Sequence, residues 1–338
     1  MTGANAADGV TATDPLHTAL CDLLGIRYPV MQAGMGMIAR GRLAAAVSEA
    51  GGLGVIGSGH LTVDELREEI VIAQQLTDKP FGVDILFAKV DTGGSEVQSY
   101  TKEVEDQVQA VLDARVPVLI SGLGNPILAI EAAHELGIVV MSVVGTARHA
   151  VRLVESGVDA VIGQGHEAGG HTGPVGTIVL IPQLVDSVDV PVVAAGGLAD
   201  GRGLAASLAL GATGVWMGTR FIATEEAHAH VNYKEKIVSI SEEGTVVTRA
   251  HSGKPCRLIT NDFTREWESR TDEIEPFPLQ LLHVGKPASE LARLQGDVES
   301  GSSPAGQGSG LIHQVRPARE VVEEIVDGAR AALARLCG

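Results

Sequence analysis

Short, almost continuously apolar segments recur along the chain and alternate with longer segments in which apolar residues are spaced three or four apart. The short segments are rich in Val, Ile, Ala and Gly and lie at 29–34, 52–57, 80–86, 116–122, 138–145, 160–165, 191–197 and 214–221. The longer segments, such as TVDELREEIVIAQQLT and GRGLAASLALG, have the period of amphipathic helices. Apolar strands alternating with helices are typical of a parallel sheet covered on both faces. The pattern therefore predicts eight β/α units.

Eight such units suit a TIM-type (β/α)8 barrel, an α/β fold that commonly takes roughly 200–250 residues. A doubly wound open sheet is the alternative, and its dinucleotide-binding form needs a G-x-G-x-x-G turn after an early strand. GMGMIARG at 34–41 comes close, with Ala39 at the third glycine. The next strand, however, ends in SGH at 58–60, where that form would need an acidic residue to hold a ribose. We therefore favour the barrel.

The sequence changes in character after the eighth apolar segment. Residues 224–310 are more polar and lack the β/α rhythm, which indicates a small, mainly helical lid domain. The Gly- and Ser-rich stretch ESGSSPAGQGSG at 299–310 precedes the amphipathic REVVEEIVDGARAALARL. We expect a solvated tail at 1–14, the barrel at 15–223, the lid domain at 224–310, and a C-terminal segment at 311–338 whose helix packs back on the barrel.

Composition narrows the classes of partner. The chain is 45% hydrophobic but only 3% aromatic, so its core must be aliphatic, and its net charge of −17 argues against nucleic acid or an anionic membrane as a partner. Cys21, Cys256 and Cys337 are widely spaced and form no C-x-x-C pair, which is typical of reduced thiols. With no leader-like N-terminus and no apolar run of about 18 residues, we expect a cytoplasmic protein without a membrane span.

Ligands of such barrels bind at the carboxyl ends of the strands, and those ends are small and polar here. Such a surface is typical of a site for a planar ligand that lies close to the backbone. It is not typical of a metal site or of a catalytic pair of carboxylates. After strands seven and eight come the glycine-containing loops AAGGLADGRG (194–203) and WMGTRF (216–221), a frequent phosphate site in these barrels. A tight β/α turn also uses glycine, but glycine in both loops favours phosphate binding.

The segment GQGHEAGGHTG at 163–173 holds the candidate catalytic residue, His171. On a glycine loop after strand six, a neutral imidazole could act as a general base, hydrogen-bond a ligand, or simply cap a helix. His166 and Glu167 lie on the same loop, and a solvent-facing position is open for both. His228 and His230 form an H-x-H pair, but without Cys or carboxylate ligands nearby we expect no metal site.

Several motifs together resemble the nitronate monooxygenase (2-nitropropane dioxygenase) superfamily of FMN-dependent oxidoreductases. They are MQAGMG (31–36), AAAVSEAGGLGVIG (44–57), PFGV (80–83), GQGHEAGGHTG (163–173), AAGGLADGRGLAASLALGATGVWMGTRF (194–221) and PAGQ (304–307). The resemblance runs from about residue 16 to the C-terminus. It implies an FMN-binding barrel with a small lid domain, in which His171 is the base or the hydrogen-bond partner of the substrate.

The resemblance also implies where the cofactor binds. The FMN phosphate is expected at Gly196, Gly197, Gly218 and Thr219. The isoalloxazine ring is expected near Ala33, Gly34, Met35, Gln164, Gly169 and Gly170. Four further strand-end residues complete the expected cofactor site: Asp84, Gly122, Ala195 and Met217. Gly306 and Gln307 match a late element that returns toward the flavin in the family, with a flexible linker as the alternative.

Two departures from the family pattern leave the substrate open. Where nitronate monooxygenases commonly read S-F-H-F-G, this chain has LISGLGNP at 119–126. Together with AHVNYKEKI at 229–237, that segment resembles the FMN-dependent enoyl-acyl carrier protein reductases. Asp84 stands where both groups usually carry Asn.

We therefore carry three hypotheses. The leading one is oxidation of a small alkyl nitronate with O2. The alternative is NAD(P)H-dependent reduction of a quinone or of an enoyl thioester on acyl carrier protein or coenzyme A. A flavin-binding scaffold without activity is the third, and the intact His171 argues against it. The sequence is compatible with both a monomer and a homodimer.

Overall fold

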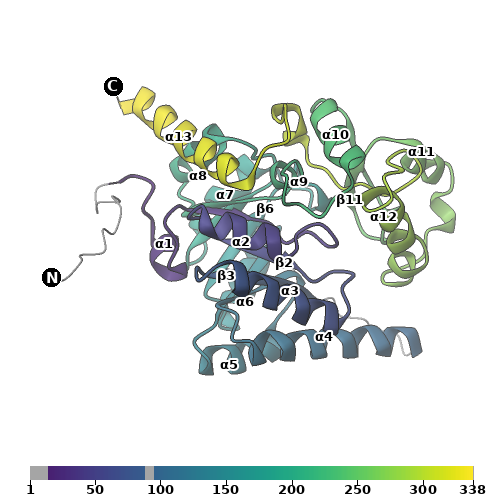
Figure 1. Cartoon of the computed structure of the whole chain (residues 1–338), viewed down its shortest axis with the longest axis horizontal. Coiled ribbons are helices and arrows are strands. Elements are labelled where there is room, and N and C mark those ends of the chain that lie inside the picture. The colour runs from purple at the N-terminus through teal and green to yellow at the C-terminus, as the bar shows by residue number, and fades with distance from the viewer. Residues whose placement is uncertain (1–13, 88–94, 338) are drawn as a thin grey trace.

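Eight parallel strands form a single sheet that curls into a barrel (Figure 1). The computed structural model describes residues 14–87 and 95–337, so the predicted tail lies outside the described residues except for Asp14. The sheet order is β1-β9-β8-β6-β5-β4-β3-β2. The strands are β1 (Val30–Gln32), β2 (Gly54–Gly57), β3 (Phe81–Phe87), β4 (Val118–Gly124), β5 (Val139–Val144), β6 (Ala160–Gln164), β8 (Val192–Ala195) and β9 (Gly214–Met217).

The first strand closes the cylinder against the residue that precedes the second. Met31 and Leu53 form a parallel bridge, in which the Leu53 N–H donates to the Val30 carbonyl and the Gln32 N–H donates to the Leu53 carbonyl, each at 2.9 Å. Each strand lies within or beside one of the eight apolar segments. The predicted TIM-type (β/α)8 barrel is therefore confirmed.

Helices surround this barrel and follow its strands in turn (Figure 1). They are α1 (Ala19–Leu24), α2 (Gly41–Glu49), α3 (Val63–Leu76), α4 (Ser95–Asp113), α5 (Ile127–Glu135), α6 (Ala147–Glu155), α7 (Thr177–Val185), α8 (Gly201–Ala209) and α9 (Thr219–Ile222). At the start of α3, Thr62 and Glu65 cap each other's backbone N–H groups, which fixes where the helix begins. Inside the barrel, Ile120, Met141 and Ile162 are fully buried, as expected for a core built from aliphatic residues.

A second lobe follows the barrel and lies over one end of it (Figure 1). Its elements are α10 (Val231–Ser239), β10 (Thr245–Thr248), β11 (Cys256–Ile259), α11 (Asp262–Glu268), the 3-10 helix η1 (Thr271–Glu273), the π-helix η2 (Leu281–Gly285), α12 (Lys286–Arg293) and the 3-10 helix η3 (Gln307–Leu311). Besides these helices the lobe contains an antiparallel sheet, β10-β11-β7, which the sequence analysis did not predict. Strand β7 (Gly170–His171) comes from the barrel loop after β6, so hydrogen bonds join the lobe to the loop that carries His171.

The last helix, α13 (Ala318–Cys337), packs on the barrel helices α8 and α2 (Figure 1). Its backbone approaches α8 closely, because a Cβ on Gly201 would overlap the backbone of Ala329. Near the start of the described chain, the Asp14 carboxylate accepts a hydrogen bond from the Arg330 guanidinium at 2.7 Å. Within the described residues, we find no helix that is both long and apolar enough to cross a membrane.

Candidate active site

Two adjoining cavities lie at the carboxyl ends of the barrel strands, beneath the second lobe. The first, which we call the histidine cavity, has a volume of about 180 Å³, and the second, the cofactor cavity, has about 120 Å³. Gly34, Met35, Gln164 and Gly169 border both of them, so the two cavities lie side by side in one site.

The structure gathers almost all of the predicted site residues around these two cavities. The cofactor cavity is lined by Ala33, Gly34, Met35, Gln164, Gly169, Ala195, Gly196, Gly197, Met217, Gly218, Thr219 and Gly306. The histidine cavity adds Asp84, Gly122, Gly170 and His171. Gln307 lines neither cavity; its backbone N–H donates to the Glu167 carbonyl at 3.0 Å.

The cofactor cavity suits a flat ligand with an anionic tail. Glycines supply much of its wall, and no residue that lines it carries a charged side chain. An anion there would be held by backbone N–H groups, which Gly196, Gly197 and Gly218 can present without a side chain in the way. These features fit FMN, whose phosphate the glycine backbone at the ends of β8 and β9 would hold.

The stretch 304–308 folds back onto the β6 loop and closes one side of the cofactor cavity. The Gly306 N–H donates to the Thr219 hydroxyl at 2.9 Å. A Cβ on Gly169 would lie 2.7 Å from the Ala305 carbonyl carbon, so only glycine permits this contact. Pro304, Gly306 and Gly308 consequently become part of the cavity wall. This segment is an ordered part of the site rather than a linker.

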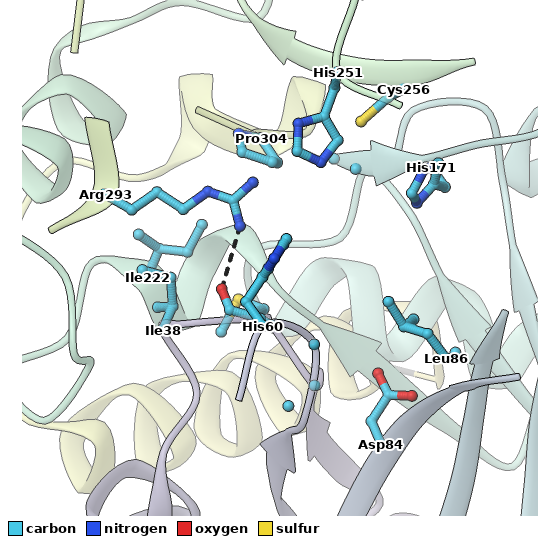
Figure 2. A pocket seen from close by; sticks show the side chains of 18 of the residues that line it. Ile38, His60, Asp84, Leu86, His171, Ile222, His251, Cys256, Arg293 and Pro304 are labelled. Carbon is cyan, nitrogen blue, oxygen red and sulfur yellow. Dashed lines mark hydrogen bonds between the residues drawn. The ribbon is translucent and has the colours of Figure 1, made fainter. Parts of the chain in front are cut away.

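Asp84 lies at the bottom of the histidine cavity, enclosed by glycine backbone (Figure 2). A Cβ on either Gly34 or Gly122 would overlap its carboxyl group. The side chain is only 7% exposed, and its Oδ1 has no hydrogen-bond partner within the described residues. Burial raises the pKa of Asp84 well above 3.8, because it removes the carboxylate from water. A hydrogen bond from the Gly122 backbone lowers the pKa, but its effect is smaller. Burial therefore favours the uncharged form of this carboxyl, and its Oδ1 has no hydrogen-bond partner among the described residues.

Both the backbone and the side chain of His171 have hydrogen-bond partners. Its backbone pairs with Cys256 of β11, and its carbonyl accepts a hydrogen bond from the Gln164 side-chain amide. Its Nε2 lies 2.7 Å from the Ser252 hydroxyl. Burial, with smaller effects of Lys254 and Arg293, lowers the pKa of His171 from 6.5 to about 4. The imidazole is thus neutral at pH 7.

Two other residues of the β6 loop with ionisable side chains, His166 and Glu167, stabilise the loop itself. The Nδ1 of His166 lies 2.8 Å from the Gly173 carbonyl oxygen. The Glu167 carboxylate accepts hydrogen bonds from the backbone N–H and the hydroxyl of Thr177, both at 2.9 Å, at the start of α7. A carboxylate at this position also complements the helix dipole.

Three further polar side chains enter the histidine cavity, and the sequence analysis did not single them out. Figure 2 shows His60, His251 and Arg293 on the cavity wall opposite Asp84. Burial is the main cause that lowers the pKa of His60 from 6.5 to about 3 and the pKa of His251 well below 6.5. Arg293 is 6% exposed, and its Nη1 donates to the Gly36 carbonyl at 3.2 Å, the dashed line in Figure 2.

Arg293 is the one fixed charge among the described residues that line the histidine cavity. Burial raises the pKa of the Cys256 thiol to about 12 and also raises the pKa of Tyr233, so both stay neutral. No carboxylate pairs with Arg293 in the described part of the chain. A buried guanidinium stays protonated but needs an anionic partner to offset its loss of hydration. In this structure the guanidinium donates to backbone carbonyls, those of Gly36 and, at 3.3 Å, Ser302, so it would attract an anion that entered the cavity.

Of these three residues, His60 alone carried a signal in the sequence. It follows the Ser58-Gly59 strand end directly, so the rule that marks strand ends as pocket wall would have reached it one residue later. His251 lies in a turn and Arg293 at the end of a lobe helix. Neither follows a barrel strand, and only the docking of the lobe on the barrel brings them to the site.

In the described residues we find no cluster of three or more His, Cys, Asp and Glu side chains arranged to hold a metal ion. Of the H-x-H pair, His230 begins α10 instead, where its Nδ1 accepts a hydrogen bond from the Asn232 N–H at 3.2 Å.

Comparison with known proteins places this geometry among flavoenzymes. The family model described as "Nitronate monooxygenase" matches residues 17–328. The structure of FabK from Thermotoga maritima is 41% identical, with a TM-score of 0.87 over 95% of this chain and 99% of that one. Nitroalkane oxidase from Streptomyces ansochromogenes is 32% identical, with a TM-score of 0.84 over 94% of this chain and 100% of that one.

A curated relative from Rhodococcus jostii is 41% identical over 75% of this chain and 68% of its own length. It is described as "(3aS,4S,5R,7aS)-5-hydroxy-7a-methyl-1-oxo-octahydro-1H-indene-4-carboxyl-CoA dehydrogenase".

Proposed function

The chain belongs to the nitronate monooxygenase family and is an FMN-dependent oxidoreductase, and we propose that it oxidises small alkyl nitronates with O2. The observation that carries this proposal is the buried guanidinium of Arg293, which has no carboxylate partner among the described residues and lies in a cavity whose histidines are neutral at pH 7. A nitronate is an anion before any reaction begins. It therefore matches a permanent cation better than a neutral thioester does.

FMN, when bound, supplies the two-electron acceptor and the site at which O2 is reduced. The backbone of Gly196, Gly197 and Gly218 would hold its phosphate, and the Asp84 carboxyl, whose Oδ1 lacks a partner among the described residues, would be available to hydrogen-bond its ring. Arg293 neutralises the nitronate, and His171 hydrogen-bonds it from the opposite side of the cavity. The lobe covers the mouth and limits the access of water.

Reduction of an enoyl thioester by NAD(P)H is the second candidate, and a specific feature favours it. A smaller cavity adjoins the histidine cavity, shares Gly59, His60, Leu86 and Leu281 with it, and is bordered by Lys286. The longer chain of a thioester would lie in this smaller cavity, which Lys286 and Glu103 both border. The likeness to the carboxyl-CoA dehydrogenase and to FabK supports the same candidate.

Anaerobic rapid mixing of the FMN-loaded protein distinguishes the two candidates. If the chain oxidises nitronates, ethyl nitronate or propionate 3-nitronate bleaches the flavin absorbance and NADH or NADPH does not. Oxygenated buffer then restores the absorbance.

Fast bleaching by a pyridine nucleotide, followed by reoxidation with an enoyl-CoA, would instead establish the reductase. A flavin that responds to neither class of reagent would contradict both candidates.

A further inference from the structure

Two buried serines lie behind two of the histidines that line the histidine cavity. The Ser252 hydroxyl is 2.7 Å from Nε2 of His171, and the Ser302 hydroxyl is 3.0 Å from Nδ1 of His251. Both serines are fully buried. The two histidine rings are neighbours on the cavity wall, with their centroids 6.1 Å apart and their planes inclined by 53°.

The position of each serine proton follows from the hydrogen bonds that are available to it. A hydroxyl has one proton to donate, and buried donors in proteins are nearly always satisfied. Among the described residues, the imidazole nitrogen is the only acceptor within hydrogen-bond distance of either hydroxyl. The Ser252 oxygen also accepts a weak bond from the Lys254 N–H at 3.4 Å, which leaves its own proton for His171.

These bonds determine where each neutral ring carries its single proton. Burial lowers the pKa of both histidines, so each ring has one N–H at pH 7. A nitrogen that accepts from serine is unprotonated. His171 therefore carries its proton on Nδ1 and His251 carries its proton on Nε2, in each case on the nitrogen away from the serine.

We propose that Ser252 and Ser302 are positioning residues that fix opposite tautomers of His171 and His251, so that both rings and Arg293 offer N–H donors to one planar anion with two oxygens. The identity of this anion as a nitronate rests on the proposed function. In this arrangement His171 is a donor and not a base. That assignment agrees with nitronate chemistry, because a nitronate has already lost its α-proton and needs no base to remove it.

The first test needs no variant. In protein labelled with 15N at histidine, the ring shifts at pH 7 identify which nitrogen carries the proton. We expect a neutral Nδ1–H ring for His171 and a neutral Nε2–H ring for His251. An Nε2–H form of His171, which would donate to Ser252, overturns the proposal.

The second test measures anion binding without turnover. Propionate, an unreactive carboxylate with the shape of a small nitronate, is titrated calorimetrically into the FMN-loaded protein. Ser252→Ala and Ser302→Ala should each weaken propionate binding about tenfold, the effect of about one hydrogen bond, and should mix the tautomers of the histidine they contact.

Ser289→Ala is the matched control, because Ser289 is equally buried in the same lobe but donates to the Gly285 carbonyl at 2.7 Å and forms no hydrogen bond with a histidine side chain in the described part of the chain. It should leave both the propionate affinity and the tautomers unchanged. Equal losses in all three variants would show a merely structural role and contradict the proposal. Correct tautomers with tight propionate binding but no reaction with nitronates would contradict only the proposed function.

Discussion

At the scale of single residues, the site works with neutral groups around one charge. Burial raises the pKa of Asp84 and lowers the pKa of each of the three cavity histidines, so it favours the uncharged form in every case, while Arg293 keeps its charge. The charge in such a cavity therefore comes mainly from the ligand and from one guanidinium. Each titratable side chain therefore has a defined and testable protonation state.

Asp84→Asn tests the neutral carboxyl. Because the pKa of Asp84 is raised in the folded chain, the unfolded chain loses this proton first, near 3.8, and wild-type stability falls as pH rises from there toward the folded pKa. The Asn variant lacks this loss, so its stability relative to wild type should grow with pH, by at most about 1.4 kcal/mol per pH unit. Urea unfolding of the flavin-free proteins at several pH values measures the difference. A constant difference would show that Asp84 is ionised in the fold.

His171→Ala should keep FMN and lower nitronate turnover by about 100- to 1,000-fold, the usual cost of one donor to a developing or bound oxyanion. His171→Gln retains an N–H donor and should recover part of that loss, whereas a base could not be replaced in this way. Steady-state kinetics with flavin content measured in parallel give both results. Unchanged turnover in His171→Ala would remove His171 from the mechanism.

The limits of sequence reasoning are clearest at this scale. His171 could be predicted because it lies on a glycine loop at a strand end. Its role could not, since the choice between base and donor depends on Ser252, which is 81 residues away in the chain.

At the scale of elements, glycine-lined strand ends form the cofactor cavity. Gly218 tests this feature directly, because a Cβ there would lie 3.6 Å from both Ala33 and Met35, an ordinary contact that fills the cavity without disturbing the wall. Gly218→Ala should therefore weaken FMN binding at least about tenfold, a loss of ~1.4 kcal/mol, while thermal stability of the flavin-free chain stays the same. Fluorescence titration with FMN and thermal unfolding measure the two effects.

Gly145→Ala is the control for that experiment. Gly145 also follows a barrel strand and has room for a methyl group, 3.9 Å from Gly173, but it lines neither cavity. It should leave FMN affinity as it is. If both variants bind FMN like wild type, the assignment of the cofactor cavity is wrong.

The barrel elements were predictable because each strand is buried on both faces and therefore reads as a continuous apolar run. The small sheet of the lobe was not. Its strands β10 and β11 are four residues long, and β7 has two, which is too short for any alternation to be visible. Their pairing depends on tertiary contact between segments about 85 residues apart, since His171 pairs with Cys256.

At the scale of the whole molecule, the lobe and the barrel form the site together. The histidines buried there should make the folded chain less stable at low pH. His60 and His171 have pKa values of about 3 and about 4 in the fold against 6.5 when exposed. The unfolded chain therefore binds more protons below pH 6.5, and stability should fall as pH drops from about 6.5 toward 4. His60→Asn should make this decline less steep. Thermal unfolding across this range checks it, and a melting temperature that is independent of pH for both proteins would contradict the assigned protonation states.

The proposed function requires that the cofactor cavity binds FMN. The decisive measurement is the flavin content of the purified protein, by visible spectrum and by equilibrium dialysis after FMN is added to stripped protein. We predict one FMN per chain, bound reversibly and lost selectively in Gly218→Ala. A folded chain that carries no flavin and takes up none would contradict the assignment of both the cavity and the function.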